Sequence, residues 1–268
     1  MLTDAHCHPF DLAEFFPAAE DQRRQLGVMC AASATTAEEF AYCERLSREA
    51  RDNNATPLFP CFAVHPQMPA VSHLSIFNEQ LVLLNALAAQ GRLAAIGETG
   101  FDLFNSAYRE TEKIQGDLFA AHLETALHYY LPLVIHARRA MHKIFACSSA
   151  LKKCRAVIFH SWPGTAGEGQ ALLRRGINAF FSFGNAIMLN HREAMRCCAV
   201  FPANQLLTET DAPFQPPRGM AFSRYADIGR VLEAAATLRR EAGTEGQTMQ
   251  ELEMIIERNF RAAFVSLE

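Results

Sequence analysis

The stretch Leu2-Thr-Asp-Ala-His-Cys-His8 decides the fold, because it is interpreted as a short strand that ends in two histidines, His6 and His8. Seven further short and mostly apolar segments follow it, separated by longer stretches with helical spacing. Strands buried on both faces have this character. Eight strand–helix alternations predict an α/β fold, a (β/α)8 TIM barrel. The predicted strands are Leu2–Cys7, Gly27–Ser33, Leu58–Val64, Leu93–Glu98, Pro132–His136, Ala156–His160, Asn178–Phe183 and Leu206–Asp211.

The segments between the strands show the apolar periodicity of amphipathic helices. An open doubly wound sheet is the alternative fold, but no Gly-rich phosphate loop follows the first strand. The chain has 268 residues and shows no internal repeat or long linker, which predicts one domain over residues 1–268. The predicted helices are Thr36–Arg51, Ile76–Ala89, Arg109–Tyr129, Arg138–Leu151, Asn190–Ala199, Tyr225–Glu241 and Met249–Leu267.

Composition narrows the classes of function. Half of the residues are hydrophobic and the net charge is −4, so there is no global basic field of the kind that marks many nucleic-acid binders. A local basic rim around a metal site would still hold a phosphate backbone. The eight cysteines form no CxxC pair, and the first residues lack the regions of a signal peptide. With no apolar run of membrane length, we expect a cytoplasmic protein without a membrane partner.

Polar residues fall at the ends of the predicted strands. Active sites of these barrels lie at the C-terminal ends of the strands. Positions two apart face the same side of a strand, so that His6 and His8 are able to chelate one ion together. A single histidine after a strand is more often structural, but six metal-competent residues at five such ends predict a shared metal site. The six are His6, His8, Glu98, His136, His160 and Asp211.

Four histidines and two carboxylates exceed the needs of one tetrahedral ion. We therefore expect two divalent metal ions with one carboxylate bridging them. Imidazole and carboxylate ligands suit zinc or manganese, and magnesium less well. Paired ions clamp the attacking and leaving oxygens when a phosphate ester is hydrolysed.

At these residues the sequence resembles the TatD family of metal-dependent deoxyribonucleases. The resemblance runs over nearly the whole chain and implies a TIM barrel with a two-metal site that cuts phosphodiester bonds, often from a DNA 3′ end. Single-stranded DNA or a 3′ end is then the expected substrate. The motifs that carry it are Asp4-Ala-His-Cys-His8, Val64-His65-Pro66, Ile96-Gly-Glu-Thr-Gly-Phe-Asp102, Leu131-Pro-Leu-Val-Ile-His-Ala-Arg138, Val157-Ile-Phe-His160, Leu207-Thr-Glu-Thr-Asp-Ala-Pro213 and Asn259-Phe260.

The resemblance also implies roles for single residues. One ion would be held by His6, His8, Glu98 and Asp211, and the other by Glu98, His136 and His160, so that Glu98 bridges the two. It implies that His65 contacts a substrate phosphate, with a loop hydrogen bond as the alternative. It further implies that Asp102 and Glu209 orient the metal ligands from behind.

Several positions depart from the family pattern. His136-Ala-Arg-Arg139 stands where the family usually has His-Ser-Arg-Asp, which reverses the charge of the last position. His160-Ser-Trp-Pro-Gly164 replaces His-Cys-Phe-Ser-Gly. Arg218-Gly219 is kept, but Met220-Ala-Phe-Ser223 replaces the usual Asn-Glu-Pro. The ligands are intact while the loops on the substrate side differ, so metal-dependent hydrolysis is better supported than DNA as the substrate.

Residues near the ligands supply candidates for catalysis and substrate binding. Glu98 and Asp211 are the expected catalytic carboxylates, and Asp211 either accepts a proton from the attacking water or serves as a ligand only. Arg138 is expected to hold a phosphate oxygen as a fork. Trp162 is expected either to stack on a nucleobase or to anchor its loop by burial. Arg139 is either a binding residue or a solvated charge.

Three other functions remain open at this point. Many amidohydrolases, which cut small C–N or ester substrates, bridge their metals with a modified lysine at the fourth strand, where this chain has Glu98. Phosphoesterases of the PHP type are expected to carry an Asp-x-His motif near the C-terminus, whereas Asp211 is followed by Ala-Pro. A metal-stabilised binding subunit that has lost catalysis is the third alternative.

Overall fold

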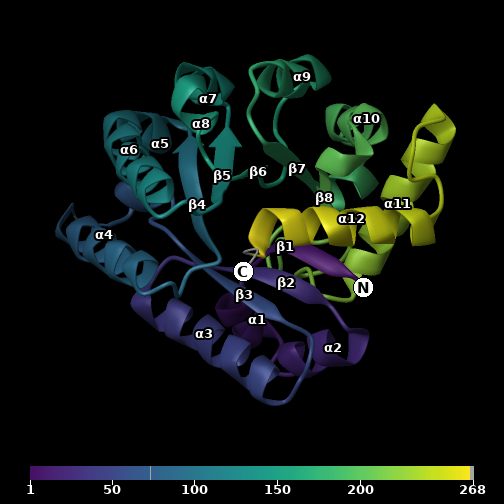
Figure 1. Ribbon diagram of the computed structural model, residues 1–268, viewed down its shortest axis with the longest axis horizontal. Helices are drawn as coiled ribbons and strands as arrows, with labels where there is room; N and C mark the ends of the chain where they lie inside the picture. The colour runs from purple at the N-terminus through teal and green to yellow at the C-terminus, as the bar shows by residue number, and fades with distance from the viewer. Residues whose placement is uncertain (73, 266–268) are drawn as a thin grey trace.

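The computed structural model describes residues 1–72 and 74–265 and contains one parallel sheet of eight strands in the order β1 to β8 (Figure 1). All eight predicted strands are present, and the sheet curls into a nearly closed barrel surrounded by helices, so the predicted TIM-barrel fold is confirmed. The strands are β1 (Thr3–Cys7), β2 (Met29–Ala34), β3 (Leu58–Phe62), β4 (Ala95–Asp102), β5 (Leu133–Arg138), β6 (Val157–Phe159), β7 (Ala179–Phe183) and β8 (Leu206–Thr208).

The barrel closes between β1 and the residues that follow β8. The backbone N–H of Asp211 donates to the carbonyl of His6 at 2.9 Å, and the N–H of His8 donates to the carbonyl of Ala212 at 2.7 Å. The Thr208 hydroxyl also donates to the carbonyl of Thr3 at 3.2 Å. These contacts join the two ends of the sheet and bring His6, His8 and Asp211 together.

Helices cover the outside of the sheet and differ from the predicted ones in their breaks. The segment predicted as Arg109–Tyr129 is divided at Thr111, and Arg138 belongs to β5 instead of starting a helix. Leu267, at the end of the last predicted helix, lies outside the described residues. The helices are α1 (Pro9–Phe15), α2 (Ala19–Leu26), α3 (Ala37–Asp52), α4 (Leu74–Ala89), α5 (Ser106–Glu110), α6 (Glu112–His128), α7 (Met141–Ala146), α8 (Ser148–Leu151), α9 (Ala166–Arg174), α10 (Arg192–Val200), α11 (Asp227–Ala242) and α12 (Met249–Phe264), with short 3-10 turns η1 (Met68–Ala70), η2 (Asn185–Met188) and η3 (Ala203–Gln205).

Three helices, α1, α2 and α9, were not predicted. In α9, Gly167 and Gly169 interrupt the apolar periodicity by which the other helices were predicted. A start signal was nevertheless present, because Thr165 and Glu168 form a reciprocal capping box in which each side chain accepts from the other residue's backbone N–H.

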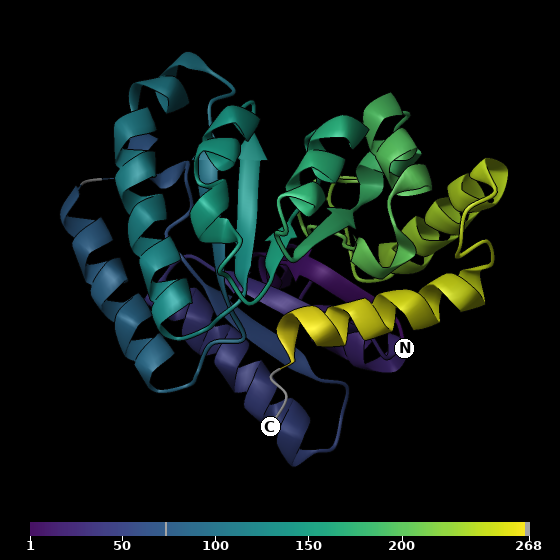
Figure 2. The same cartoon turned by 45° about the horizontal axis from the view of Figure 1, so that its top comes forward.

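The lower end of the barrel, where the strands begin, is closed by α12. Phe260 and Phe264 of this helix pack against residues from the barrel interior, including Val134 and Ile158. The Asn259 side chain donates to the carbonyl of Leu206 at the start of β8, at 2.8 Å. Figure 2 shows α12, in yellow, beside the N-terminus. The opposite end, where the strands finish, is therefore the one available for a site.

A buried arginine fastens α2 to the same lower end. Arg23 is fully buried and donates to the carbonyls of Val28 and Thr56 at 2.7 and 3.0 Å. Its Nε also donates to the Glu20 carboxylate at 2.7 Å. Arg23 thus satisfies backbone acceptors at the start of two strands.

None of the helices within the described ranges is both long enough and apolar enough to span a membrane.

Candidate metal centre

The carboxylate of Glu98 lies at the centre of the polar cluster and is almost completely buried. Its Oε2 is 3.1 Å from His6 Nε2 and 3.8 Å from His8 Nε2. Its Oε1 is 2.6 Å from His136 Nδ1 and 3.2 Å from His160 Nε2. The two oxygens of one side chain therefore face two different groups of imidazoles.

Glycines on both sides of Glu98 let β4 approach β5 closely. A Cβ atom at Gly97 would lie 2.4 Å from the Cβ of Val134, and one at Gly100 would lie 2.0 Å from the carbonyl oxygen of His136. Gly100 also has a positive φ of 138°, which side chains rarely permit. These glycines hold Glu98 next to His136.

Asp211 completes the group on the β1 side. Its Oδ1 is 3.5 Å from His8 Nε2 and 3.7 Å from His6 Nε2, and the two histidine nitrogens are 3.1 Å apart. Asp211 has a left-handed backbone with φ of 54°, a conformation that persists only where the surroundings hold it. Gln215 contributes to this, because its amide donates to Asp211 Oδ2 at 2.7 Å and to Ser161 Oγ at 2.8 Å.

His65 lies within contact distance of the candidate ligand Glu98. Its Nε2 is 3.3 Å from Oε1 of Glu98, and His65, Glu98 and His136 form one of three groups whose donor atoms lie within 4.8 Å of one another. The other two groups are His6, Glu98 and His160, and His6, His8 and Asp211. His65 is thus placed to contact either an ion or a phosphate.

The two acidic residues expected behind the ligands each contact one histidine. Asp102 Oδ2 is 3.2 Å from His136 Nε2 and accepts from the Gln67 amide at 2.7 Å. Glu209 Oε1 is 3.2 Å from His160 Nδ1. Carboxylates in such positions fix the orientation of ligand imidazoles.

Electrostatics within the cluster favour ionised carboxylates. Burial alone would raise the pKa of Glu98, but the neighbouring charges of His160, His65 and His6 hold it well below its usual range. Burial would also raise the pKa of Asp102, but hydrogen bonds from His136 and Gln67 lower it to about 2. Burial would lower the pKa of His160, but the nearby carboxylates raise it well above its usual range. The cluster therefore pairs fixed negative charge with imidazoles.

This donor set fits divalent cations. Imidazole nitrogen and carboxylate oxygen are the ligands of zinc and manganese sites, and three groups of donors already converge within the described part of the chain. Anionic carboxylates would offset the charge of the ions in a buried setting.

Asp4 and Ser33 each contact His6, and no role was predicted for either; Asp4 Oδ1 accepts from the backbone N–H of His6 at 3.3 Å. Asp4 is buried and accepts from the Thr210 backbone at 2.9 Å and from its hydroxyl at 2.6 Å. Burial raises its pKa to about 7. Ser33 Oγ is 3.2 Å from His6 Nδ1. The position of Asp4, two before His6 on the same strand face, was a usable signal, whereas Ser33 carried none.

Comparisons with known proteins show which family this chain belongs to. The sequence profile of the family described as "TatD related DNase" matches residues 3–265. The chain belongs to this family. It is 30% identical to the uncharacterized metal-dependent hydrolase YjjV of Escherichia coli (strain K12) over 90% of this chain and 92% of that protein. It is 29% identical to the 3'-5' ssDNA/RNA exonuclease TatD of Pantoea vagans over 87% and 86% of the two chains.

A solved structure gives the same result. The crystal structure of the YjjV protein superposes with a TM-score of 0.82 at 26% identity, covering 99% of this chain and 98% of the other. The chain is therefore a TatD-family metal-dependent hydrolase that uses divalent metal.

Of the two roles considered for Trp162, stacking on a nucleobase is corrected by the structure. Its side chain is only 4% exposed. Its ring packs edge-on against Phe159, Phe181 and Phe201, with centroids 5.3, 4.7 and 5.9 Å away. No ring face is left for a nucleobase, and the alternative, that Trp162 anchors its loop by burial, is supported.

An aromatic ring does lie at the TatD-type metal cluster, but on another loop. Phe214 is 48% exposed, and its ring centroid is 5.1 Å from that of His8. The signal for it was its place three residues beyond Asp211, in the irregular segment after the last strand.

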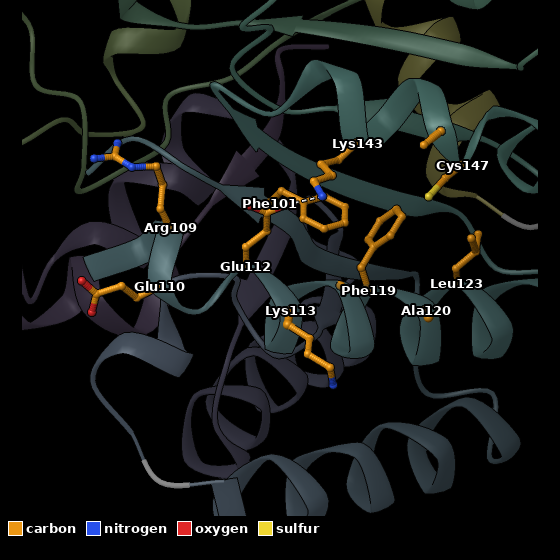
Figure 3. Close-up of a pocket in the computed structure, with 12 residues that line it drawn as sticks. Phe101, Arg109, Glu110, Glu112, Lys113, Phe119, Ala120, Leu123, Lys143 and Cys147 are labelled. Atoms are coloured by element: carbon orange, nitrogen blue, oxygen red, sulfur yellow. Dashed lines mark ion pairs between the residues drawn. The ribbon is translucent and has the colours of Figure 1, made fainter. Parts of the chain in front are cut away.

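A cavity on the outer wall of the barrel lies away from this TatD-type cluster. It has a volume of about 680 Å³ and opens on the outside of the barrel between α6 and α7. Figure 3 shows Phe101 and Phe119 in its wall and the ion pair between Glu112 and Lys143. No histidine lines it. The candidate functional site is therefore assigned from its donor chemistry and not from the volume of a cavity.

Proposed function

We propose that this chain is a two-metal nuclease that hydrolyses phosphodiester bonds in single-stranded DNA, at 3′ ends in particular. The observation that carries the proposal is the division of the Glu98 carboxylate, with one oxygen toward His6 and the other toward His136 and His160. A carboxylate whose two oxygens face different groups of histidines would be suited to bridge two ions. Relatives that are named 3'-5' ssDNA/RNA exonucleases support the substrate class.

The proposed ligands form two sets that share Glu98. When bound, divalent cations supply Lewis acidity and lower the pKa of a nearby water. Zinc or manganese suits these donors better than magnesium. One set is His6, His8, Glu98 and Asp211, and the other is Glu98, His136 and His160, with His65 beside it, as the contacts of the two Glu98 oxygens suggest. The donor atom of His160 also lies within 4.8 Å of that of His6.

Asp211 is the proposed proton acceptor. Burial would raise its pKa, but the charge of His160 and the hydrogen bond to His8 outweigh burial and keep the pKa below its ordinary value. It is therefore ionised and able to accept a proton at neutral pH. The Gln215 amide holds Oδ2, so Oδ1 stays directed at the two histidines. Oδ1 would therefore be the oxygen that accepts a proton from a water bound beside these histidines.

Substrate contacts are proposed for Arg138, His65 and Phe214. Arg138 is exposed, ends β5 two residues beyond His136, and faces the same side of the strand. Its planar guanidinium suits a phosphate of the scissile ester. Phe214 offers an exposed ring beside His8 on which a base is able to stack.

We further infer one catalytic domain over residues 1–268 and a cytoplasmic location. The ligand strands β1 and β8 come from opposite ends of the sequence and meet where the barrel closes. All eight cysteines are free thiols, and seven of them are buried, as suits a reducing compartment.

The test is metal-dependent shortening of single-stranded DNA. The protein is loaded with manganese, magnesium or zinc and incubated with 5′-labelled oligonucleotide, beside Glu98→Gln as the control. We expect a ladder of shortened products that is absent in the variant, while circular dichroism shows that the variant is folded. A folded wild-type protein that holds divalent ions and leaves DNA intact would overturn the proposal. It would point to an amide or small-ester substrate, or to a silent metal-binding subunit.

A further inference from the structure

The rim of the barrel next to β4 and β5 carries an aromatic ring stacked by two arginines. Phe104 lies two residues beyond the end of β4 and is 39% exposed. The guanidinium carbon of Arg138 is 3.6 Å from the centroid of its ring, and that of Arg139 is 4.6 Å away. A guanidinium that stacks on a ring keeps the N–H donors at its edge free for other partners.

Short contacts tie this rim to the metal ligands. The N–H of Phe104 donates to Asp102 Oδ1 at 2.9 Å, and the other oxygen of Asp102 is 3.2 Å from His136. The N–H of Leu103 donates to the carbonyl of Arg138 at 2.8 Å. The ring and the arginines are therefore held at a fixed place relative to the metal centre.

The backbone of Arg139 adopts a conformation that a non-glycine residue rarely takes. Its φ is 56°, in the left-handed region. Such outliers cluster at functional sites, where the surrounding structure holds them. Nη1 of Arg139 donates to the carbonyl of Phe104 at 3.3 Å, which keeps the side chain turned back toward the ring.

The positive charges on this rim are not neutralised. In residues 1–72 and 74–265, no carboxylate lies within 4.0 Å of the guanidinium groups of Arg138, Arg139 or the neighbouring Arg109, in contrast to Arg92 and Arg45, which pair with glutamates. Asp102 is already engaged by His136 and a glutamine amide. Three arginines without a carboxylate partner within the described residues, on a chain of net charge −4, indicate a place for an anion.

We propose that Arg139 and Phe104 form a second phosphate subsite, which binds the phosphodiester next to the one being cleaved. The proposal rests on the proposed nuclease function and deepens it, because the ligand class becomes a nucleic-acid strand with at least two successive phosphates. Arg138 is nearer His136 in sequence and holds the scissile phosphate, whereas Arg139 is reached only by a longer strand. The subsite therefore selects polynucleotides over small phosphodiesters.

The test compares Arg139→Ala with Arg240→Ala, which removes an exposed arginine from α11, remote in sequence from the rim. The metal-loaded proteins are assayed with bis(4-nitrophenyl) phosphate, which has one phosphodiester, and with a single-stranded oligonucleotide. In Arg139→Ala we expect the ratio of kcat/KM for the oligonucleotide to that for the small ester to fall at least about fivefold. The slope of log KM for the oligonucleotide against log salt should also decrease by about 0.7. In Arg240→Ala both quantities should match the wild type.

A structural role for Arg139 would lower activity on both substrates alike and leave the ratio unchanged, which would overturn the proposal. If the wild type cleaves the small ester and leaves the oligonucleotide intact, the nuclease function fails and the subsite is tested by inhibition. The oligonucleotide should then inhibit ester hydrolysis, with a Ki at least about fivefold higher in Arg139→Ala. Absent inhibition, or equal inhibition in both proteins, would contradict the subsite.

Discussion

Protonation of His122 should destabilise the folded protein at acid pH. This side chain is fully buried on α6, and its Nε2 accepts from the N–H of Val64 at 3.0 Å. Its Nδ1 therefore carries the proton and donates to the carbonyl of Leu118 at 2.6 Å. A second proton on Nε2 would face an N–H group and lose that hydrogen bond. Burial is the largest cause that lowers the pKa of His122, from 6.5 to about 4.

The sign and size of the effect follow from the two pKa values. Below the ordinary pKa the unfolded chain binds a proton that the folded chain does not, so stability falls as pH decreases and levels off below the folded pKa of about 4. The loss attributable to His122 is about 1.4 kcal/mol near pH 5.5 and about 2.5 kcal/mol near pH 4.5. Above the ordinary pKa the loss vanishes.

The assay is urea unfolding of the metal-free protein across this pH range, with His122→Gln as the comparison. The variant should start less stable at neutral pH by about 1–3 kcal/mol, since Val64 N–H loses its acceptor. On acidification the wild type should lose about 2.5 kcal/mol more than the variant by about pH 4.5, so that the two curves converge. Equal losses in the two proteins would refute the assignment of a neutral buried His122.

Three further substitutions test contacts around the site and the fold. Gln215→Leu removes the 2.7 Å hydrogen bond to Asp211 and should weaken metal affinity by about 10–100-fold in a chelator competition, whereas a change below about twofold would contradict its positioning role. Asp102→Asn should weaken metal affinity by a similar factor because His136 loses its anionic partner, and an unchanged affinity would argue against that role. Arg23→Met should lower the unfolding free energy by about 3 kcal/mol, measured by urea unfolding. The exposed control Arg45→Met should change the unfolding free energy by less than about 1 kcal/mol, and equal effects of the two substitutions would contradict a stabilising role for buried Arg23.

Most of the strands were predictable because they are largely apolar on both faces, as buried parallel strands usually are, whereas β1 and β4 also carry polar residues of the site. The residues at which the strands end were harder to predict. β4 continues past Glu98 to Asp102 because Gly97 and Gly100 allow polar residues to run beside β5, which apolar periodicity does not reveal. The break at Thr111 was also hidden, since the helical pattern continues across it.

The convergence of the six candidate ligands followed from topology alone, because all C-terminal strand ends of a barrel meet at one mouth. The orientation of each oxygen of Glu98 depends on side-chain packing and could not be predicted. Gln215 reaches Asp211 through a left-handed backbone with φ of 49° in an irregular loop, which leaves no pattern in the sequence. The burial of Trp162 depends on phenylalanines from three other segments, so its sequence position beside a ligand was misleading.

We propose that a pair of divalent ions shares Glu98 and drives cleavage. The most direct measurement is the metal content per chain of reconstituted, gel-filtered wild type and Glu98→Gln, determined by mass spectrometry on the samples used for the DNA assay. We predict two ions per wild-type chain with cleavage, and at most one ion per variant chain with cleavage lost. Full cleavage by a wild type that holds one ion, or two ions with unchanged cleavage in the variant, would contradict the claim.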